Sequence, residues 1–268
     1  MKTNKSLRSF IVLAILGFTS FVSLSQGTLI FEKAYDFQDN NLPGQDGNTG
    51  IDWGTYVTQT SDGGYIVIGF TNIPDAINPV DAGGAVHQVY IVKMMADGEL
   101  DQTFNGAVSL PFRRGEIKYT ESQYGNEINQ TTDGKYIAIS TLFEFPGVSA
   151  TVFKLQATGL LDLSFGGGTG MVNLGGTATD KRTGYAIIQT PDGNYLAGGY
   201  REGGYPGGFG GDDAYLVKID ASTGDILWEK YYGSMGNDLV YKIAPTADGG
   251  FVFVKNIFTF GTLFIPCV

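Results

Sequence analysis

The chain has one cysteine, Cys267, and one histidine, His87, among its 268 residues. A single cysteine cannot form a disulfide bond within the chain, so stability has to come from a packed core, and a chain of this length can bury a large one. A catalytic histidine needs a nucleophile or further metal ligands beside it, and no serine here lies in the context of a nucleophile elbow. His87 is therefore interpreted as a solvated loop residue, and no catalytic residue is assigned.

Basic residues are also scarce in this chain. Lysine and arginine number 17 against 27 aspartates and glutamates, which gives a formal charge of −10. So acidic a protein would repel the phosphate groups of a nucleic acid. We therefore expect no nucleic-acid partner.

Long hydrophobic runs are absent except near the N-terminus. Residues 1–25 combine three basic residues in the first eight positions, an apolar run at 10–21 and a small-x-small pattern at 23–25. These features are typical of a secretory signal peptide cleaved before Gln26, and the apolar run is shorter than the roughly 20 residues that a membrane-spanning helix needs. The sequence thus predicts a secreted or cell-surface protein with no integral membrane segment after signal removal. Loss of residues 1–25 removes three basic and no acidic residues, which brings the formal charge to −13.

Glycine is abundant, at 40 residues, and much of it stands in a repeat. Each repeat has an Asp-Gly pair with a threonine two residues before it, an aromatic residue three after it and a branched aliphatic residue five before it. The four pairs begin at Asp62, Asp133, Asp192 and Asp248. Because Asp-Gly tolerates the positive φ of tight turns, each pair predicts a β-hairpin between two short β-prone runs.

A third run with a lysine in a fixed position follows three of these hairpins, and a second turn leads to a fourth run. The third runs hold Lys93, Lys154 and Lys218, and the fourth runs are residues 99–104, 160–165 and 225–233. Many runs are apolar on both faces, as a sheet packed between two other sheets requires. Repeated four-stranded antiparallel sheets packed face to face predict an all-β fold, a β-propeller that is either four-bladed or a fragment of a larger ring.

The repeats also set the expected domain boundaries. After the signal peptide, residues 26–268 form one β-propeller repeat domain, with an N-terminal closing strand at 29–36 that repeats the sequence of residues 226–233. Blades are expected at about 51–110, 120–175 and 182–233, followed by a partial blade at 238–268. The C-terminal tail is a candidate third strand for that partial blade. The sequence is compatible both with a closed four-bladed ring and with an unclosed, truncated one.

Two sets of motifs resemble known repeats. Residues 218–228 (KIDASTGDILW) are similar to a repeat of the quinoprotein-like propellers, with the pattern Asp-x-x-Thr-Gly-x-x-x-Trp. Residues 97–104 (DGELDQTF), more loosely 158–165, and the T-x-DGGYI stretch at 60–66 are similar to repeats of bacterial extracellular proteins. The resemblance implies a bacterial extracellular β-propeller in which Trp228 docks one blade on the next. It implies an architecture and leaves the activity open.

The best candidate for metal binding is the segment 46–52 (DGNTGID). Asp46, Asn48 and Asp52 alternate there as oxygen donors do in a calcium loop. The glutamate that an EF-hand carries at loop position 12 is absent, because Val57 stands there. An EF-hand is thus excluded, a polar turn is the simpler interpretation, and calcium at a looser site stays open. No other cofactor is expected.

No pair of carboxylates can be assigned to catalysis from the sequence. Asp212 and Asp213 end a glycine-rich loop, where acidic residues are simply solvated, whereas the loop aromatics Tyr205 and Phe209 could stack on a sugar or a protein. We therefore expect an exported, non-enzymatic binding or cell-surface module whose propeller loops contact a glycan or a protein. The alternatives are a quinoprotein-like or hydrolytic propeller enzyme and an inactive fragment of a longer surface protein.

Overall fold

The computed structural model describes residues 10–15, 29–35, 52–71, 88–104, 116–119, 123–144, 147–177, 179–203, 208–257 and 263–267. Apart from one 3-10 turn, η1 (Gly166–Gly168), the regular structure in these ranges consists of antiparallel strands. None of its helical segments has the length and apolar character needed to cross a membrane. The predicted all-β class is therefore confirmed.

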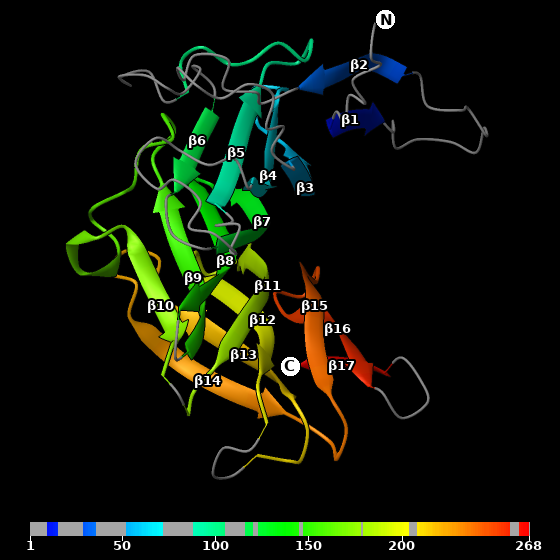
Figure 1. The fold of residues 1–268 in the computed structure, drawn as a ribbon, viewed down its shortest axis with the longest axis vertical. Helices are drawn as coiled ribbons and strands as arrows, with labels where there is room; N and C mark the ends of the chain where they lie inside the picture. The colour runs from blue at the N-terminus through cyan, green and yellow to red at the C-terminus, as the bar shows by residue number, and fades with distance from the viewer. Residues whose placement is uncertain are drawn as a thin grey trace, which may run out of the picture.

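Four consecutive sheets, here called sheets 1 to 4, form the body of the molecule (Figure 1). Each is a meander in which strands adjacent in sequence are adjacent in the sheet. Sheet 1 has β3 (Asp52–Gln59), β4 (Tyr65–Thr71), β5 (Gln88–Met94) and β6 (Glu116–Tyr119). Sheet 2 has β7 (Gln123–Gln130), β8 (Tyr136–Glu144), β9 (Gly147–Leu155) and β10 (Met171–Gly175). Sheet 3 has β11 (Arg182–Gln189), β12 (Tyr195–Arg201), β13 (Asp213–Ile219) and β14 (Ile226–Tyr232), and sheet 4 has β15 (Asp238–Pro245), β16 (Phe251–Ile257) and β17 (Leu263–Cys267).

A separate two-stranded sheet lies at the N-terminal side, where β1 (Phe10–Ile15) pairs with β2 (Leu29–Tyr35). β1 falls within the segment predicted to be a signal peptide, and β2 is the segment expected to close the ring. In this structure β2 pairs with β1 and does not join sheet 4, which has three strands where the others have four. The apolar sequence FIVLAI of β1 supplies a strand partner for β2 while residues 10–15 remain on the chain.

The fourth strands of sheets 1 and 2 are not the ones that the sequence predicted. Residues 99–104 and 160–165 contribute only isolated bridges, through Leu100 and Leu161, and the paired fourth strands are β6 and β10. In the first of these segments the carboxylate of Asp101 accepts hydrogen bonds from the amide and the hydroxyl of Thr103. Such an Asx turn curls the backbone away from an extended path. The prediction for residues 225–233 is confirmed by β14.

Aromatic residues link the end of one sheet to the start of the next. Phe104 packs edge-on against Tyr136, with ring centroids 5.9 Å apart, and Phe165 packs against Tyr195 in the same way at 6.1 Å. Trp228 stacks on Phe251, the equivalent residue of sheet 4, at 6.5 Å. The turn that precedes the fourth strand in sheets 1 and 2 therefore places its phenylalanine between two sheets, as the resemblance implied for Trp228.

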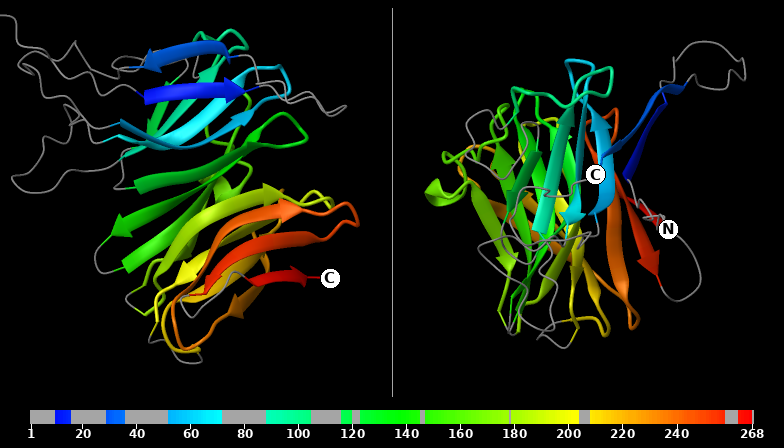
Figure 2. Two further views of the ribbon diagram at one scale, coloured as in Figure 1. Left: turned by 90° about the vertical axis from the view of Figure 1, so that its right-hand side faces the viewer. Right: turned by 45° about the horizontal axis from the view of Figure 1, so that its top comes forward.

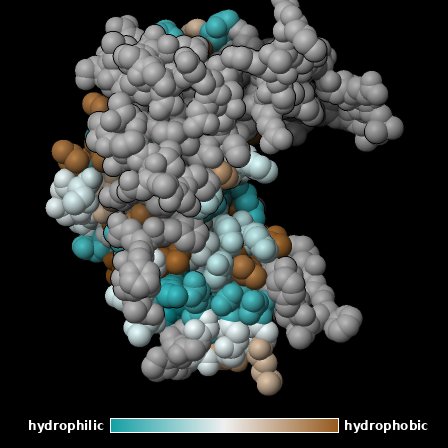
Figure 3. All heavy atoms as spheres, viewed as in Figure 1, coloured by the Kyte–Doolittle hydropathy of each residue, from teal (hydrophilic) through white to brown (hydrophobic). Residues whose placement is uncertain are grey.

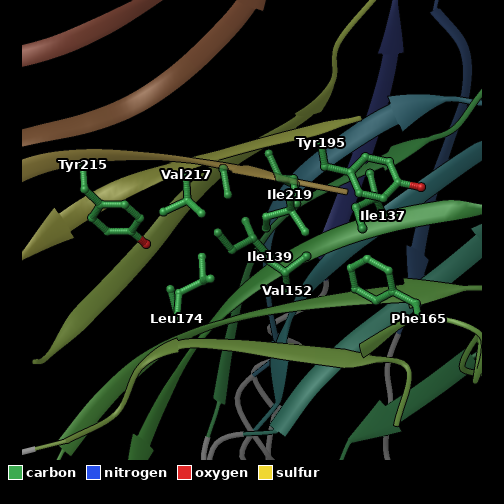
Figure 4. Packing of buried hydrophobic residues seen from close by; sticks show 12 residues of the cluster. Ile137, Ile139, Val152, Phe165, Leu174, Tyr195, Tyr215, Val217 and Ile219 are labelled. Atoms are coloured by element: carbon green, nitrogen blue, oxygen red, sulfur yellow. The ribbon is translucent and has the colours of Figure 1, made fainter. Parts of the chain in front are cut away.

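The apolar core lies between consecutive sheets, each of which buries both faces where it has two neighbours. Figure 4 shows the core between sheets 2 and 3, where side chains of the two sheets point toward one another. Its largest members include Ile137, Ile139, Val152, Phe165, Tyr195, Tyr215, Val217 and Ile219. Two further clusters lie between sheets 1 and 2 and between sheets 3 and 4. The third strands β5, β9 and β13 are buried along nearly their whole length, which explains why apolar residues stand on both of their faces.

The Asp-Gly turns have the geometry that their sequence requires. Their second residues are in the left-handed region, with φ of 82° at Gly63, 79° at Gly134, 88° at Gly193 and 87° at Gly249. In sheet 1 the Asp62 carboxylate accepts hydrogen bonds from Thr60 Oγ1 at 2.5 Å and from Lys93 Nζ at 2.8 Å. Lys218 pairs with Asp192 in the same way. In sheets 1 and 3 the fixed lysine therefore closes the turn, whereas in sheet 2 Lys154 donates to the Ala221 carbonyl at 2.7 Å.

The four sheets follow one another along the chain, and the first strand of each lies against the first strand of the next. β3 contacts β7, β7 contacts β11, and β11 contacts β15. Figures 1 and 2 show the sheets in sequence order, with sheet 4 packed beside β11 and β12. The first strands thus converge on one side of the molecule.

Candidate functional site

Each first strand carries a β-bulge at the same position, which shapes the side where the strands converge. The extra residues are Thr55, Asn126, Tyr185 and Tyr241. A bulge bends its strand and re-aims the side chains beside it. The neighbouring strands need glycine there, because a Cβ on Gly69 or Gly199 would lie 1.9 or 1.8 Å from a carbonyl oxygen of the bulged strand.

The residue after each bulge occupies one equivalent position in all four sheets. These residues are Tyr56, Glu127, Ala186 and Lys242. Lys242 Nζ lies 2.5 Å from Glu127 Oε1 and 3.8 Å from the centroid of the Tyr56 ring. Side chains from sheets 1, 2 and 4 therefore meet at one point, which we call the axial cluster.

Ala186 explains how an ion pair can join sheets 2 and 4, which are not neighbours. At this position sheet 3 contributes only a methyl group, which is buried against sheet 4. The long side chain of Lys242 on sheet 4 reaches Glu127 on sheet 2. A bulky side chain in place of Ala186 would compete for the same space.

Glu127 is almost completely buried, at 2% exposure, whereas the Lys242 side chain is 44% exposed. The second hydrogen bond to Glu127 Oε1 comes from Asn129 Nδ2 at 3.0 Å, and the Ile187 amide donates to Oε2 at 3.3 Å. Both carboxylate oxygens are thus engaged in holding three sheets together. This pattern is typical of a structural carboxylate, because a general acid needs an oxygen directed at a substrate.

Three tyrosines lie side by side on sheets 3 and 4, one of them directly before Lys242 in the chain, and we call them the tyrosine stack. The Tyr185 ring stacks on Tyr241, with centroids 5.3 Å apart and planes inclined by 29°, and lies 6.0 Å from Tyr200. Tyr241 is the outermost of the three, with 47% exposure. Burial, followed by the neighbouring Tyr200, Tyr241 and Asp212, raises the pKa of Tyr185 to about 12. Tyr185 is therefore protonated at neutral pH.

A second aromatic group lies where β3 begins. Trp53 stacks nearly parallel to Phe70, with centroids 6.2 Å apart, and Phe70 packs edge-on against Tyr124 at 4.6 Å. Trp53 is 60% exposed. Two exposed aromatic rings, each backed by another ring, therefore stand on the first strands of sheets 1 and 4.

The loop between β12 and β13 is held by its own acidic residues. Asp212 accepts the Gly203 amide at 3.1 Å, and the buried Asp213 accepts the Phe209 amide at 3.0 Å. Phe209 itself is 52% exposed. The predicted solvated pair thus includes a buried residue that shapes the loop, whereas Phe209 presents an aromatic ring, as the sequence suggested. Tyr205 lies outside the described residues.

A charged cluster on sheet 3 was not anticipated from the sequence. Arg182 donates to Asp180 at 2.8 Å and to Glu229 at 3.1 Å, and its guanidinium lies 5.8 Å from the centroid of the Tyr231 ring. Burial opposes the charge of Arg182, but the hydrogen bonds to the two acids outweigh it and raise its pKa. Arg201 also pairs with Asp180 at 2.8 Å. The acids in this cluster are neutralised by arginines, so it is best explained as a support for sheet 3.

The predicted calcium loop is not brought together by the described residues. Asp46 and Asn48 lie outside them, and Asp52 is the first residue of β3. His87 also lies outside the described residues. In the described part of the chain, no three histidine, cysteine, aspartate or glutamate side chains lie together where they could hold a metal ion. The calcium site therefore stays a prediction.

Comparisons with known proteins give no identity for the chain. No family model and no curated protein matches it. Among solved structures it is similar to the endo-arabinase from Bacteroides thetaiotaomicron VPI-5482, at 11% identity and a TM-score of 0.42 over 89% of this chain and 81% of that chain. It is also similar to a hypothetical protein from Leishmania major, at 10% identity and a TM-score of 0.27 over 77% and 82%. Values this low assign neither a family nor an activity.

Proposed function

We propose that this chain is an exported, non-enzymatic binding module built on a β-propeller-like scaffold, and that it binds a glycan or a protein. The binding face is the side where the first strands converge, together with the loops that precede them. The proposal rests on a contrast between an acidic side chain and two aromatic side chains of this face. The buried Glu127 of this side is held by an ion pair and a backbone hydrogen bond, whereas Trp53 and Tyr241 expose aromatic rings that are stacked on others.

The scaffold supports this role because repeated sheets form a stiff base for variable loops. Rings that are already stacked lose little conformational freedom when a ligand covers them. Aromatic residues are also enriched in binding surfaces because they offer a large apolar face with a polar tip. On the face drawn in Figure 3, the described hydrophobic residues form small patches among polar ones.

The proposed function is tested by hydrogen exchange with and without ligand. The full chain is first tested against immobilised neutral polysaccharides and against purified extracellular proteins, and each binder is then mapped. We expect slower exchange in β15, β3 and residues 208–212 when a ligand is bound, and unchanged exchange at the Asp-Gly turns. Protection confined to those turns, or cleavage of a bound polysaccharide seen as new reducing ends, would contradict the proposal.

A further inference from the structure

We propose that the tyrosine stack beside Lys242 is a binding site for a neutral saccharide, which stacks one sugar ring on the exposed face of Tyr241. This inference rests on the proposed binding function and names the ligand class for one part of that face. It uses three features of the structure: the backed ring, the polar groups beside it, and the position of the stack in the repeat.

The ring of Tyr241 is both accessible and held in place. Its 47% exposure leaves one side open, while Tyr185 backs the other at a centroid distance of 5.3 Å. Tyr200 in turn flanks Tyr185 at 6.0 Å. A flat ring fixed by a second ring is suited to the apolar face of a sugar ring, because contact costs little side-chain entropy.

The polar groups beside the ring match the hydroxyl groups of a sugar. Lys242 follows Tyr241 in the chain, and its side chain is 44% exposed while Glu127 and the Tyr56 ring hold its ammonium in place. An ammonium donates hydrogen bonds, and tyrosine hydroxyls both donate and accept them. Ligand sites commonly combine an aromatic wall with a few fixed polar groups of this kind.

The charge of the protein narrows the choice of ligand. The chain carries a formal charge of −10, and Lys242 is already paired with Glu127. An acidic polysaccharide or a single-stranded nucleic acid would be repelled by this net charge. A neutral saccharide meets no such penalty.

The contacts that join consecutive sheets do not require the tyrosine stack. At the same bulge position, Thr55 Oγ1 donates to the Gly125 carbonyl and Asn126 Nδ2 donates to the Gly184 carbonyl, each at 2.6 Å. A small polar residue is therefore enough to connect one sheet to the next. The change to tyrosine in sheets 3 and 4 creates an aromatic surface beyond what that connection requires.

The test is titration calorimetry with cellohexaose, xylohexaose and mannohexaose, with hexagalacturonate as the charged counterpart. We expect at least one neutral hexasaccharide to bind and hexagalacturonate to bind at least about tenfold more weakly. Tyr241→Ala should weaken the neutral ligand at least about tenfold, since it removes a central aromatic contact. Tyr241→Phe, which keeps the ring, should stay within about threefold of the unchanged protein. Should Tyr241→Ala not fold, Tyr241→Leu removes the flat ring while keeping apolar volume, and it should show the same loss.

Leu163→Ala is the matched control, because it removes another exposed hydrophobic side chain, 61% exposed, in the turn at residues 160–165, and it should leave the affinity within about threefold. Loss of binding in Leu163→Ala with none in Tyr241→Ala would overturn the saccharide site at the stack but keep the binding function. Binding of an extracellular protein with no binding of any hexasaccharide would also overturn the saccharide site and keep the binding function. If the chain binds neither saccharide nor protein, the proposed function fails as well.

Discussion

At the scale of single residues, loss of the axial ion pair should lower the stability of the protein measurably. Lys242→Met leaves Glu127, at 2% exposure, with one strong donor fewer. We expect the free energy of unfolding to fall by about 1–3 kcal/mol, the usual cost of depriving a buried group of a partner. Urea unfolding followed by circular dichroism measures this change.

The control for this variant is Lys181→Met. Lys181 pairs with Glu202 at 3.1 Å, and both side chains are about one-third exposed. Exposed ion pairs contribute little, so the expected change is within about 0.5 kcal/mol. Equal losses in the two variants would show that the axial pair contributes no more than a surface pair.

The turn aspartate Asp62 should give the protein a pH-dependent stability in acid. Burial would raise its pKa, but hydrogen bonds from Lys93, Thr60 and the Gly64 amide outweigh this and lower the pKa from 3.8 to about 2. Between these values the unfolded chain binds more protons than the folded protein, so the contribution is complete above about pH 4 and is lost as the pH falls toward 2. Melting temperatures recorded from pH 2 to pH 7 measure it.

Two variants connect this acid dependence to the turn. Asp62→Asn should flatten the fall in melting temperature below pH 4, and Lys93→Met should flatten it in part, because Thr60 and the Gly64 amide still bind the carboxylate. If the melting temperature of both variants falls below pH 4 as steeply as that of the unchanged protein, other carboxylates cause the loss of stability between pH 2 and pH 4.

The sequence reveals these residues to different degrees. The turn aspartates are predictable because a local rule, the positive φ of Asp-Gly, determines their structure. The axial cluster is not, since Glu127 and Lys242 are 115 residues apart and neither belongs to a motif. The bulges that bring them together also leave no strong mark in the sequence. Aligning the four repeats would have placed Tyr56, Glu127, Ala186 and Lys242 in one column, which is the signal that could have found them.

At the scale of elements, the aromatic rings that pack between consecutive sheets stabilise the contact between those sheets. Phe165→Ala should lower the free energy of unfolding by about 3–5 kcal/mol, because the ring is fully buried between sheets 2 and 3 and its loss leaves a cavity. Leu163→Ala, in the same turn but 61% exposed, should change it by no more than about 0.5 kcal/mol. Chemical denaturation of both variants compares them directly. A small loss in Phe165→Ala would mean that the sheets close over the missing ring.

The strands themselves were largely predictable, and the exceptions have one cause. Hairpins and third strands follow from short apolar runs beside Asp-Gly turns, whereas residues 99–104 and 160–165 also contain apolar residues and were read as strands. A turn and not a strand buries their phenylalanines, Phe104 and Phe165, and half-buries Leu100 and Leu161, which form only isolated bridges. Hydrophobic spacing alone cannot separate these two kinds of burial.

At the scale of the whole molecule, the pairing of β2 should depend on residues 1–25. Its sequence LIFEKAY resembles ILWEKYY of β14, the fourth strand of sheet 3, and sheet 4 has three strands. In a chain that begins at Gln26, β1 is absent, and we expect β2 to pair with β17. Hydrogen exchange of Leu263–Cys267 should then be slower than in the full chain. Equal exchange in the two chains would show that β2 does not complete sheet 4.

The ion pair between Lys242 and Glu127 has a consequence for how the molecule responds to force. In a linear array of repeats that touch only their neighbours, tension on the C-terminus detaches the units one by one, each with its own rupture event. Here the ion pair links sheet 4 directly to sheet 2, although sheet 3 stands between them in the chain. Tension on the C-terminus has to break this ion pair before sheet 4 can separate from sheets 2 and 3. We therefore expect the last three repeats to resist extension as one mechanical unit, to which sheet 1 is joined by its shared core with sheet 2 and by the Tyr56 ring.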